Sequence, residues 1–132
     1  MQKILLIEDD DQLRRNTAEI LELSNYEVYT AENGKIGVEK ALQCQPDLVI
    51  CDLMMPVMSG DELFLKIRNF RKFDQVPFII ITADMTFENK LKQLENGVND
   101  FINKPFKIQE LLFKIKNILQ YKDSVIKLNQ DP

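Results

Sequence analysis

The chain alternates between short apolar runs and longer segments in which apolar and polar residues mix. Five segments have the composition of strands, at 3–8, 26–30, 47–52, 77–82 and 99–103. Residues 48–51 and 78–81 are apolar without a break, a pattern typical of strands that are covered on both faces. Strands of that kind belong to parallel sheets, which have helices on both sides.

The segments between these runs have the spacing of amphipathic helices. In the first segment, the side chains at positions 13, 17, 20 and 21 fall on one face of a helix. The last carries an apolar stripe of helical period at positions 108, 111, 112, 115, 118 and 119. Ser59 and Glu62 have the spacing of a capping box, which marks the start of the third helix.

Five alternations of strand and helix predict an α/β fold: a flavodoxin-like, doubly wound parallel sheet of five strands with five helices. Right-handed crossovers that place helices on both faces give the strand order 2-1-3-4-5. The first and third strands are then neighbours at the topological switch point. Ligands bind there, in the crevice outside the carboxyl ends of the strands.

The chain has 132 residues, the size of one ordinary domain. We assign residues 1–120 to that domain. Residues 121–132 are assigned to a C-terminal tail or to the start of a linker to a further domain. Lys122 interrupts the apolar stripe, which argues against a simple continuation of the last helix.

The composition excludes several classes of function. A net charge of −4 with scattered basic residues argues against a nucleic-acid-binding surface. The absence of histidine excludes zinc sites that need imidazole, histidine-containing catalytic triads and a phosphohistidine on this domain. Cys44 and Cys51 lack the spacing of a disulfide framework or a metal site. No signal peptide or membrane-length apolar stretch is visible, so we expect a cytoplasmic protein.

Charged residues follow three of the apolar runs: Glu8 and Asp9 after the first, Asp52 at the third and Lys104 after the last. Because the carboxyl ends of parallel strands converge, we expect these side chains to meet. Carboxylates repel one another unless a cation lies among them, and Mg²⁺ prefers oxygen ligands and phosphate. Asp52 can ligate such a metal, and its free oxygen can attack phosphorus to give an acyl phosphate.

Two further groups can contact a phosphoryl group at the same edge of the sheet. The hydroxyl of Thr82, at the end of the fourth run, can donate to a phosphoryl oxygen, and so can the backbone N–H of Ala83. The ammonium of Lys104 would offset the negative charge of the transferring group.

These residues form motifs with defined spacing. The motifs are the acidic pair 8–9, Asp52 followed by Leu-Met-Met-Pro and by Ser-Gly at 59–60, the pair 82–83 and the triplet 104–106. Asp52 and Thr82 are 30 residues apart, and Lys104 follows Thr82 by 22 residues. With these motifs, residues 2–120 resemble the receiver domain of two-component response regulators. Each motif alone is a weak signal, whereas the combination is highly specific.

The resemblance implies that Asp52 accepts a phosphoryl group from a sensor histidine kinase or a histidine phosphotransfer protein. It implies an Mg²⁺ site in which Asp9 is a direct ligand and Glu8 acts through water. Asp52 and the backbone carbonyl of Met54 would complete the protein ligands. Such a domain is a signalling module rather than an enzyme with its own substrate, although it assists its own phosphorylation and dephosphorylation.

The resemblance also implies that Thr82 and Lys104 contact the phosphoryl group, and that the Lys104–Pro105 peptide bond is cis. Phe101 matches an aromatic that turns inward as Thr82 moves. The face formed by the fourth helix, fifth strand and fifth helix would then repack and bind an output domain, a partner protein or a second copy. Asp100 fits the subfamily that dimerises through this face, but the last helix lacks the matching arginine.

Alternatives remain for the function and for single residues. A flavodoxin-like FMN binder would share the fold, but acids occupy 8–10, where it needs a phosphate-cradling loop. A haloacid-dehalogenase-type phosphatase would need a second aspartate where Met54 stands. A pseudo-receiver that only binds partners stays open. Asp10 is expected only to cap a helix, and Phe101, taken alone, would be an edge-strand aromatic packed on the last helix.

Overall fold

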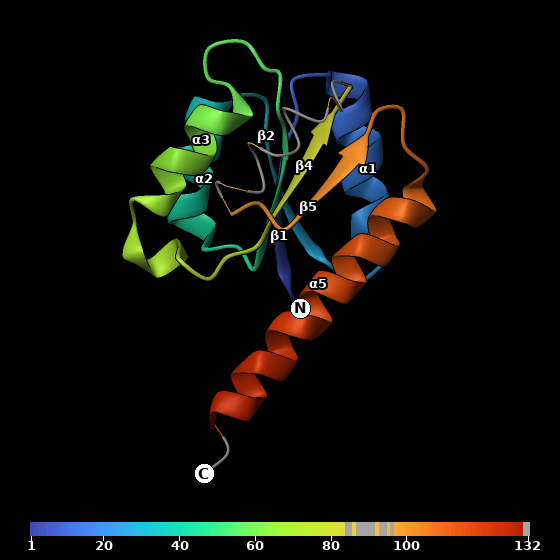
Figure 1. Ribbon diagram of the computed structural model, residues 1–132. Helices are drawn as coiled ribbons and strands as arrows, with labels where there is room; N and C mark the ends of the chain where they lie inside the picture. The colour runs from blue at the N-terminus through green and yellow to red at the C-terminus, as the bar shows by residue number, and fades with distance from the viewer. Residues whose placement is uncertain (84–85, 87–91, 93–94, 96, 131–132) are drawn as a thin grey trace.

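The computed structural model describes residues 1–83, 86, 92, 95 and 97–130. These residues form a five-stranded parallel sheet between two layers of helices (Figure 1). The strands are β1 (Lys3–Ile7), β2 (Glu27–Ala31), β3 (Leu48–Asp52), β4 (Phe78–Thr82) and β5 (Asp100–Asn103). Their spatial order is β2-β1-β3-β4-β5, which confirms the predicted topology.

Four helices and a short 3₁₀ helix are described. They are α1 (Asp11–Leu23), α2 (Gly34–Cys44), α3 (Gly60–Arg68), α5 (Ile108–Gln130) and the 3₁₀ helix η1 (Arg71–Phe73). Helices α2 and α3 cover one face of the sheet, and α1 and α5 cover the other (Figure 1). The predicted fourth helix falls between β4 and β5, largely outside the described residues.

Successive strand residues pack against opposite helix layers. In β1, Leu5 and Ile7 belong to the core on the α2–α3 face, whereas Ile4 and Leu6 belong to the core on the α1–α5 face. Since side chains alternate across a strand, a sheet that is covered on both faces needs apolar residues at every position. This alternation explains the uninterrupted apolar runs. Cys51 is fully buried in the core on the α2–α3 face.

Capping side chains fix where two helices begin. Asp10 is the N-cap of α1, and its carboxylate accepts the backbone N–H of Leu13 at 2.9 Å, which confirms its capping role. Ser59 is the N-cap of α3 and accepts the N–H of Glu62 at 3.2 Å, so α3 starts where the capping-box spacing indicated. Both helices thus begin directly after loops that follow β1 and β3.

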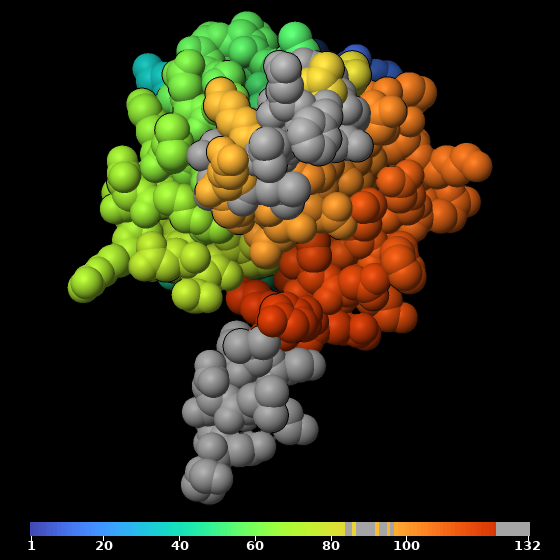
Figure 2. Space-filling view, viewed as in Figure 1, coloured from blue at the N-terminus to red at the C-terminus, as the bar shows by residue number. Residues whose placement is uncertain are grey.

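Helix α5 differs from the sequence prediction because it continues past Lys122 to Gln130. The Lys122 ammonium lies 3.2 Å from the carbonyl oxygen of Asp47, so the residue that interrupts the apolar stripe contacts the residue just before β3. Figure 2 shows residues 108–123 of α5, in orange to red, on the surface of this side of the molecule. In the part of the chain that the structure describes, none of the helices has the length and hydrophobicity of a membrane span.

Candidate functional site

The sheet register brings the carboxyl ends of four strands to one edge. Ile7 pairs with Cys51, Asp52 with Ile81 and Thr82 with Asn103. Glu8 and Lys104 each follow one of these paired residues directly, so they lie at the same level as Asp52 and Thr82. This is the edge at which a doubly wound sheet binds its ligands.

Lys104 joins two buried carboxylates at this edge. Its ammonium lies 2.6 Å from Glu8 Oε1 and 2.7 Å from Asp52 Oδ2. The Glu8 and Asp52 side chains are only 4% and 6% exposed. Charged groups so deeply buried require partners, and one lysine here serves two acids. The site therefore keeps an excess of negative charge in an environment with little water.

The acidic groups offer a set of oxygen donors to a metal ion. Carboxylate oxygens of Glu8, Asp9 and Asp52 all lie within 4.8 Å of one another. Asp9 is exposed, so a cation can reach the cluster from solvent. Mg²⁺ prefers oxygen ligands, commonly one or two carboxylates together with phosphate and water. These residues fit that ion by donor type and by proximity.

Hydrogen bonds and close packing hold Asp52 in place. Its Oδ1 accepts the backbone N–H of Met54 at 3.1 Å, and the N–H of Gly60 donates to the carbonyl of Leu53 at 2.9 Å. A Cβ atom at Gly60 would lie 2.8 Å from the carbonyl oxygen of Asp52. Only glycine permits this approach of α3 to β3. The sequence analysis noted the Ser-Gly pair but did not predict this contact, which depends on how α3 packs on the strand.

The remaining predicted site residues lie at the ends of β4 and β5. Thr82 is 2% exposed, and its carbonyl oxygen accepts the backbone N–H of Lys104 at 2.9 Å. Ala83 follows β4 and is exposed. Phe101 is half-buried and packs against the core on the α2–α3 face, not on the last helix. The Lys104–Pro105 peptide bond is cis, as the resemblance implied.

Burial and neighbouring charges shift the pKa values of two site residues. Burial raises the pKa of Glu8 to about 7, and the nearby carboxyls of Asp9 and Asp52 push in the same direction, against the opposing effect of Lys104. Burial alone would lower the pKa of Lys104, but its bonds to Asp52 and Glu8 together raise it. Lys104 is therefore a permanent cation at this site, whereas Glu8 can carry a proton near neutral pH.

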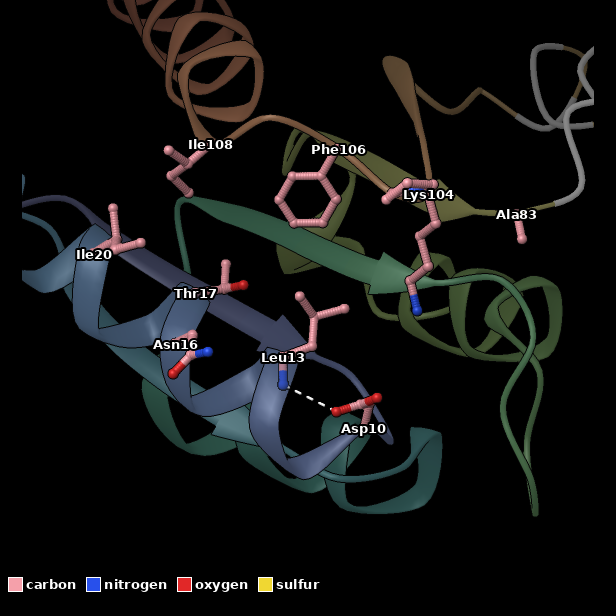
Figure 3. Close-up of a pocket in the computed structure, with 10 residues that line it drawn as sticks. Asp10, Leu13, Asn16, Thr17, Ile20, Ala83, Lys104, Phe106 and Ile108 are labelled. Atoms are coloured by element: carbon pink, nitrogen blue, oxygen red, sulfur yellow. Dashed lines mark hydrogen bonds between the residues drawn. The ribbon is translucent and has the colours of Figure 1, made fainter.

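A hollow of about 510 Å³ opens beside the charged cluster, between α1 and the segment that follows β5 (Figure 3). Its walls carry half-buried apolar side chains, among them Leu13, Ile20, Phe106 and Ile108. Lys104 and Ala83 also line it, which makes it continuous with the charged site. The sequence did not predict this hollow, because the helical stripe suggested that positions 13 and 20 would face the core.

A family model for the response regulator receiver domain matches residues 4–116. The chain belongs to this family. Its members are signalling domains of two-component systems whose general function is to accept a phosphoryl group. The family assignment agrees with the motif-based resemblance and separates the chain from FMN binders and phosphatases that share the fold.

Among curated proteins, response regulator ArlR of Staphylococcus saprophyticus is 42% identical over 120 residues, which cover 91% of this chain and 53% of that protein. Hybrid signal transduction histidine kinase D of Dictyostelium discoideum is 40% identical over 119 residues, 90% of this chain and 8% of that protein. The chain thus spans about half of one relative and a small part of the other.

Solved structures agree with the fold. Chemotaxis protein CheY4 of Vibrio cholerae aligns with a TM-score of 0.86 and 29% identity, over 89% of this chain and 98% of that chain. A CheY-like receiver domain protein from Methanospirillum hungatei aligns with a TM-score of 0.88 and 31% identity, over 94% of this chain and 98% of that chain. Both alignments cover most of this chain and nearly all of the solved chain.

Proposed function

We propose that this chain is a phosphorylation-controlled receiver that accepts a phosphoryl group on Asp52. The donor would be a phosphohistidine on a sensor histidine kinase or a histidine phosphotransfer protein. The observation that carries the proposal is the position of the Lys104 ammonium, 2.6 Å from Glu8 and 2.7 Å from Asp52 at the carboxyl edge of the sheet. A buried cation beside a nucleophilic carboxylate and further acids suits phosphoryl transfer.

The proposed metal is Mg²⁺, held by the carboxylates of Glu8, Asp9 and Asp52 and by the backbone carbonyl of Met54. When bound, Mg²⁺ offsets negative charge on the transferring group. The proximity of the three carboxylates supports this assignment. The hydrogen bond from the Met54 N–H to the Asp52 carboxylate supports Met54 as a further ligand, because it keeps this residue beside Asp52.

The chain's own groups account for the remaining chemistry. An Asp52 oxygen forms the new bond to phosphorus while the donor's nitrogen–phosphorus bond breaks, and the leaving imidazole keeps the electron pair and a proton. Lys104 would contact the phosphoryl oxygens, and the Thr82 hydroxyl and Ala83 N–H would donate to them. In this way the domain would assist its own phosphorylation and, with water as the acceptor, its dephosphorylation.

The hollow beside the site supports a protein as the donor. It joins an apolar wall that includes Leu13, Ile20 and Phe106 to the charged edge that carries Lys104. Such a surface can be covered by a partner that presents its phosphohistidine at the edge of the hollow (Figure 3). A cytoplasmic location, where kinases have access to ATP, belongs to the same proposal.

Phosphorylation would act on the face formed by the predicted fourth helix, β5 and α5. Thr82 would move toward the phosphoryl group, and Phe101, now half-buried, would turn inward. A local change of charge would thereby bias a two-state surface that binds an output domain, a partner protein or a second copy. The intramolecular pair of Lys114 and Asp100, 2.9 Å apart, lies on this face and would have to rearrange if either residue joined an interface.

Intact mass spectrometry after incubation with Mg²⁺ and acetyl phosphate tests the acceptor. We expect the wild type to gain one phosphoryl group, Asp52→Asn to gain none, and removal of Mg²⁺ with EDTA to abolish the gain. Asp74→Asn, which changes an exposed aspartate after η1, is the matched control and should behave as wild type. Phosphorylation of Asp52→Asn to the wild-type extent would refute the assignment. If neither acetyl phosphate nor a phosphorylated donor protein modifies the wild type, the domain is a pseudo-receiver.

A further inference from the structure

The acidic loop between β1 and α1 is held by a side chain outside the predicted site. Arg14, one turn into α1, donates from its guanidinium to the backbone carbonyl of Glu8 at 2.8 Å. The same guanidinium contacts the carboxylate of Asp11. The Arg14 side chain is only 12% exposed although it lies on a surface helix. Side chains on a helix lean toward its N-terminus, which directs Arg14 back over this loop.

The bond from Arg14 completes the fixation of Glu8. The N–H of Glu8 donates to the carbonyl of Ala31 at 3.0 Å, and its carboxylate binds Lys104 at 2.6 Å. The carbonyl of Glu8 belongs to the same peptide unit as the N–H of Asp9. Because a peptide unit is planar, a donor that holds this carbonyl also fixes the direction in which the chain enters Asp9.

We propose that Arg14 is a positioning residue for the metal-binding loop: by holding the Glu8 carbonyl, it orients Glu8 and Asp9 toward Mg²⁺. This inference rests on the proposed function, because it assigns Arg14 a role in the Mg²⁺ affinity of that site. Groups that orient metal ligands without touching the metal typically change affinity by about tenfold or more when they are removed.

The sign of the effect separates orientation from simple electrostatics. A positive charge close to a cation site opposes cation binding, so loss of charge alone would strengthen Mg²⁺ binding. Loss of an orienting hydrogen bond would weaken it. Arg15, the next residue on α1, is exposed and provides the same charge without the bond to the Glu8 carbonyl. Substitutions at positions 14 and 15 therefore change the charge equally and the orientation unequally.

Isothermal titration of metal-free protein with Mg²⁺ tests the proposal in three variants. We expect Arg14→Gln to raise the dissociation constant about tenfold. Arg15→Gln should leave the constant unchanged or lower it slightly. Arg14→Lys keeps the charge but loses the planar fork that reaches Glu8 and Asp11 together, so it should raise the constant about threefold. The rise in melting temperature caused by Mg²⁺ should shrink in the same order.

Circular dichroism of each metal-free variant checks that it is folded. If Arg14 had a purely structural role, its substitution would lower the melting temperature without changing the Mg²⁺ affinity of the folded protein. Mg²⁺ binding by Arg14→Gln as tight as that of Arg15→Gln would overturn the proposal. If Arg14→Gln is unfolded, Arg14→Lys decides, and affinity equal to wild type overturns it. Failure of the wild type itself to bind Mg²⁺ would instead refute the proposed metal site.

Discussion

Strand β3 has an aspartate near each end, and each aspartate meets a lysine, but the two pairs differ in burial. Asp52, at the carboxyl end, shares Lys104 with Glu8, and both acids are almost fully buried. Asp47, just before the strand, is 41% exposed and lies 3.7 Å from Lys122 of α5. The same two residue types thus form a crowded, water-poor cluster at one end and a loose surface contact at the other.

The difference indicates what each pair is for. An exposed ion pair contributes little to stability, so the Asp47–Lys122 contact adds little to the apolar packing that holds α5 against the sheet. We expect two buried acids around one lysine to gain less from attraction than they lose in desolvation and mutual repulsion. A cluster that costs stability is retained when function needs it. The burial of the acids at the carboxyl end fits the proposed role of that end in phosphoryl transfer, whereas the exposed pair at the amino end is a contact between α5 and the residue before β3.

The largest expected difference between the two ends comes from removing each lysine in turn. In Mg²⁺-free buffer, Lys104→Met should lower the free energy of unfolding by about 3 kcal/mol, because it leaves two buried acids without a cation. Lys122→Met should lower it by less than about 1 kcal/mol, because its partner is exposed. Urea denaturation followed by circular dichroism measures both. Equal losses for the two variants would contradict the contrast between the ends.

The stabilisation by added Mg²⁺ should also differ between the two lysine variants. A bound cation would take over the compensation that Lys104 provides, so added Mg²⁺ should stabilise Lys104→Met more than it stabilises the wild type. Lys122→Met should gain the same amount from Mg²⁺ as the wild type does. If Mg²⁺ stabilises all three proteins equally, the metal does not bind among the carboxylates of Glu8 and Asp52.

Removal of each aspartate charge should give effects of opposite sign. Asp52→Asn relieves the repulsion with Glu8 and leaves Lys104 to pair with one acid, so the free energy of unfolding should rise by about 1 kcal/mol. Asp47→Asn weakens the bond that its carboxylate accepts from the backbone N–H of Lys3 at 2.8 Å and should cost about 0.5 kcal/mol. Thermal and urea unfolding without Mg²⁺ give both values. A loss of stability in Asp52→Asn would show that the cluster is a net stabilising one.

The sequence contained enough information for the sheet but not for every contact. Apolar residues at each position of 48–51 and 78–81 indicated two-sided cover, and the crossover rule then gave the strand order. The convergence of Glu8, Asp52 and Lys104 followed from that order, because parallel strands bring their carboxyl ends together.

Contacts that depend on side-chain direction or helix packing were not predictable in this way. Lys122 interrupts an apolar stripe, yet α5 continues because the lysine reaches Asp47, which is distant in sequence. The bond from Arg14 to the Glu8 carbonyl depends on one rotamer, and neighbouring Arg15 gives no sequence signal that distinguishes the two arginines. The close approach at Gly60 depends on how α3 meets β3.

A last expected effect, similar in size to that of Asp52→Asn, is a pH dependence that only the buried end should show. The pKa of Glu8 is raised from 4.5 to about 7 in the folded protein, chiefly by burial. A raised pKa means that Glu8 contributes stability that is fully present below pH 4.5 and is lost as the pH rises through about 7. Without Mg²⁺, the loss of this proton from Glu8 should lower the free energy of unfolding by about 1 kcal/mol between pH 6 and pH 7.

Glu8→Gln is the matched variant for this measurement, because it keeps the size of the side chain and cannot titrate. Its unfolding free energy should vary less between pH 6 and pH 7 than that of the wild type, whereas Asp47→Asn should retain the wild-type slope. Mg²⁺ competes with the proton on Glu8, so the Mg²⁺ affinity of the wild type should increase over the same interval. A wild-type slope equal to that of Glu8→Gln would mean that Glu8 is already ionised at pH 6. The contrast between the two ends would then depend on packing rather than on the protonation of a buried acid.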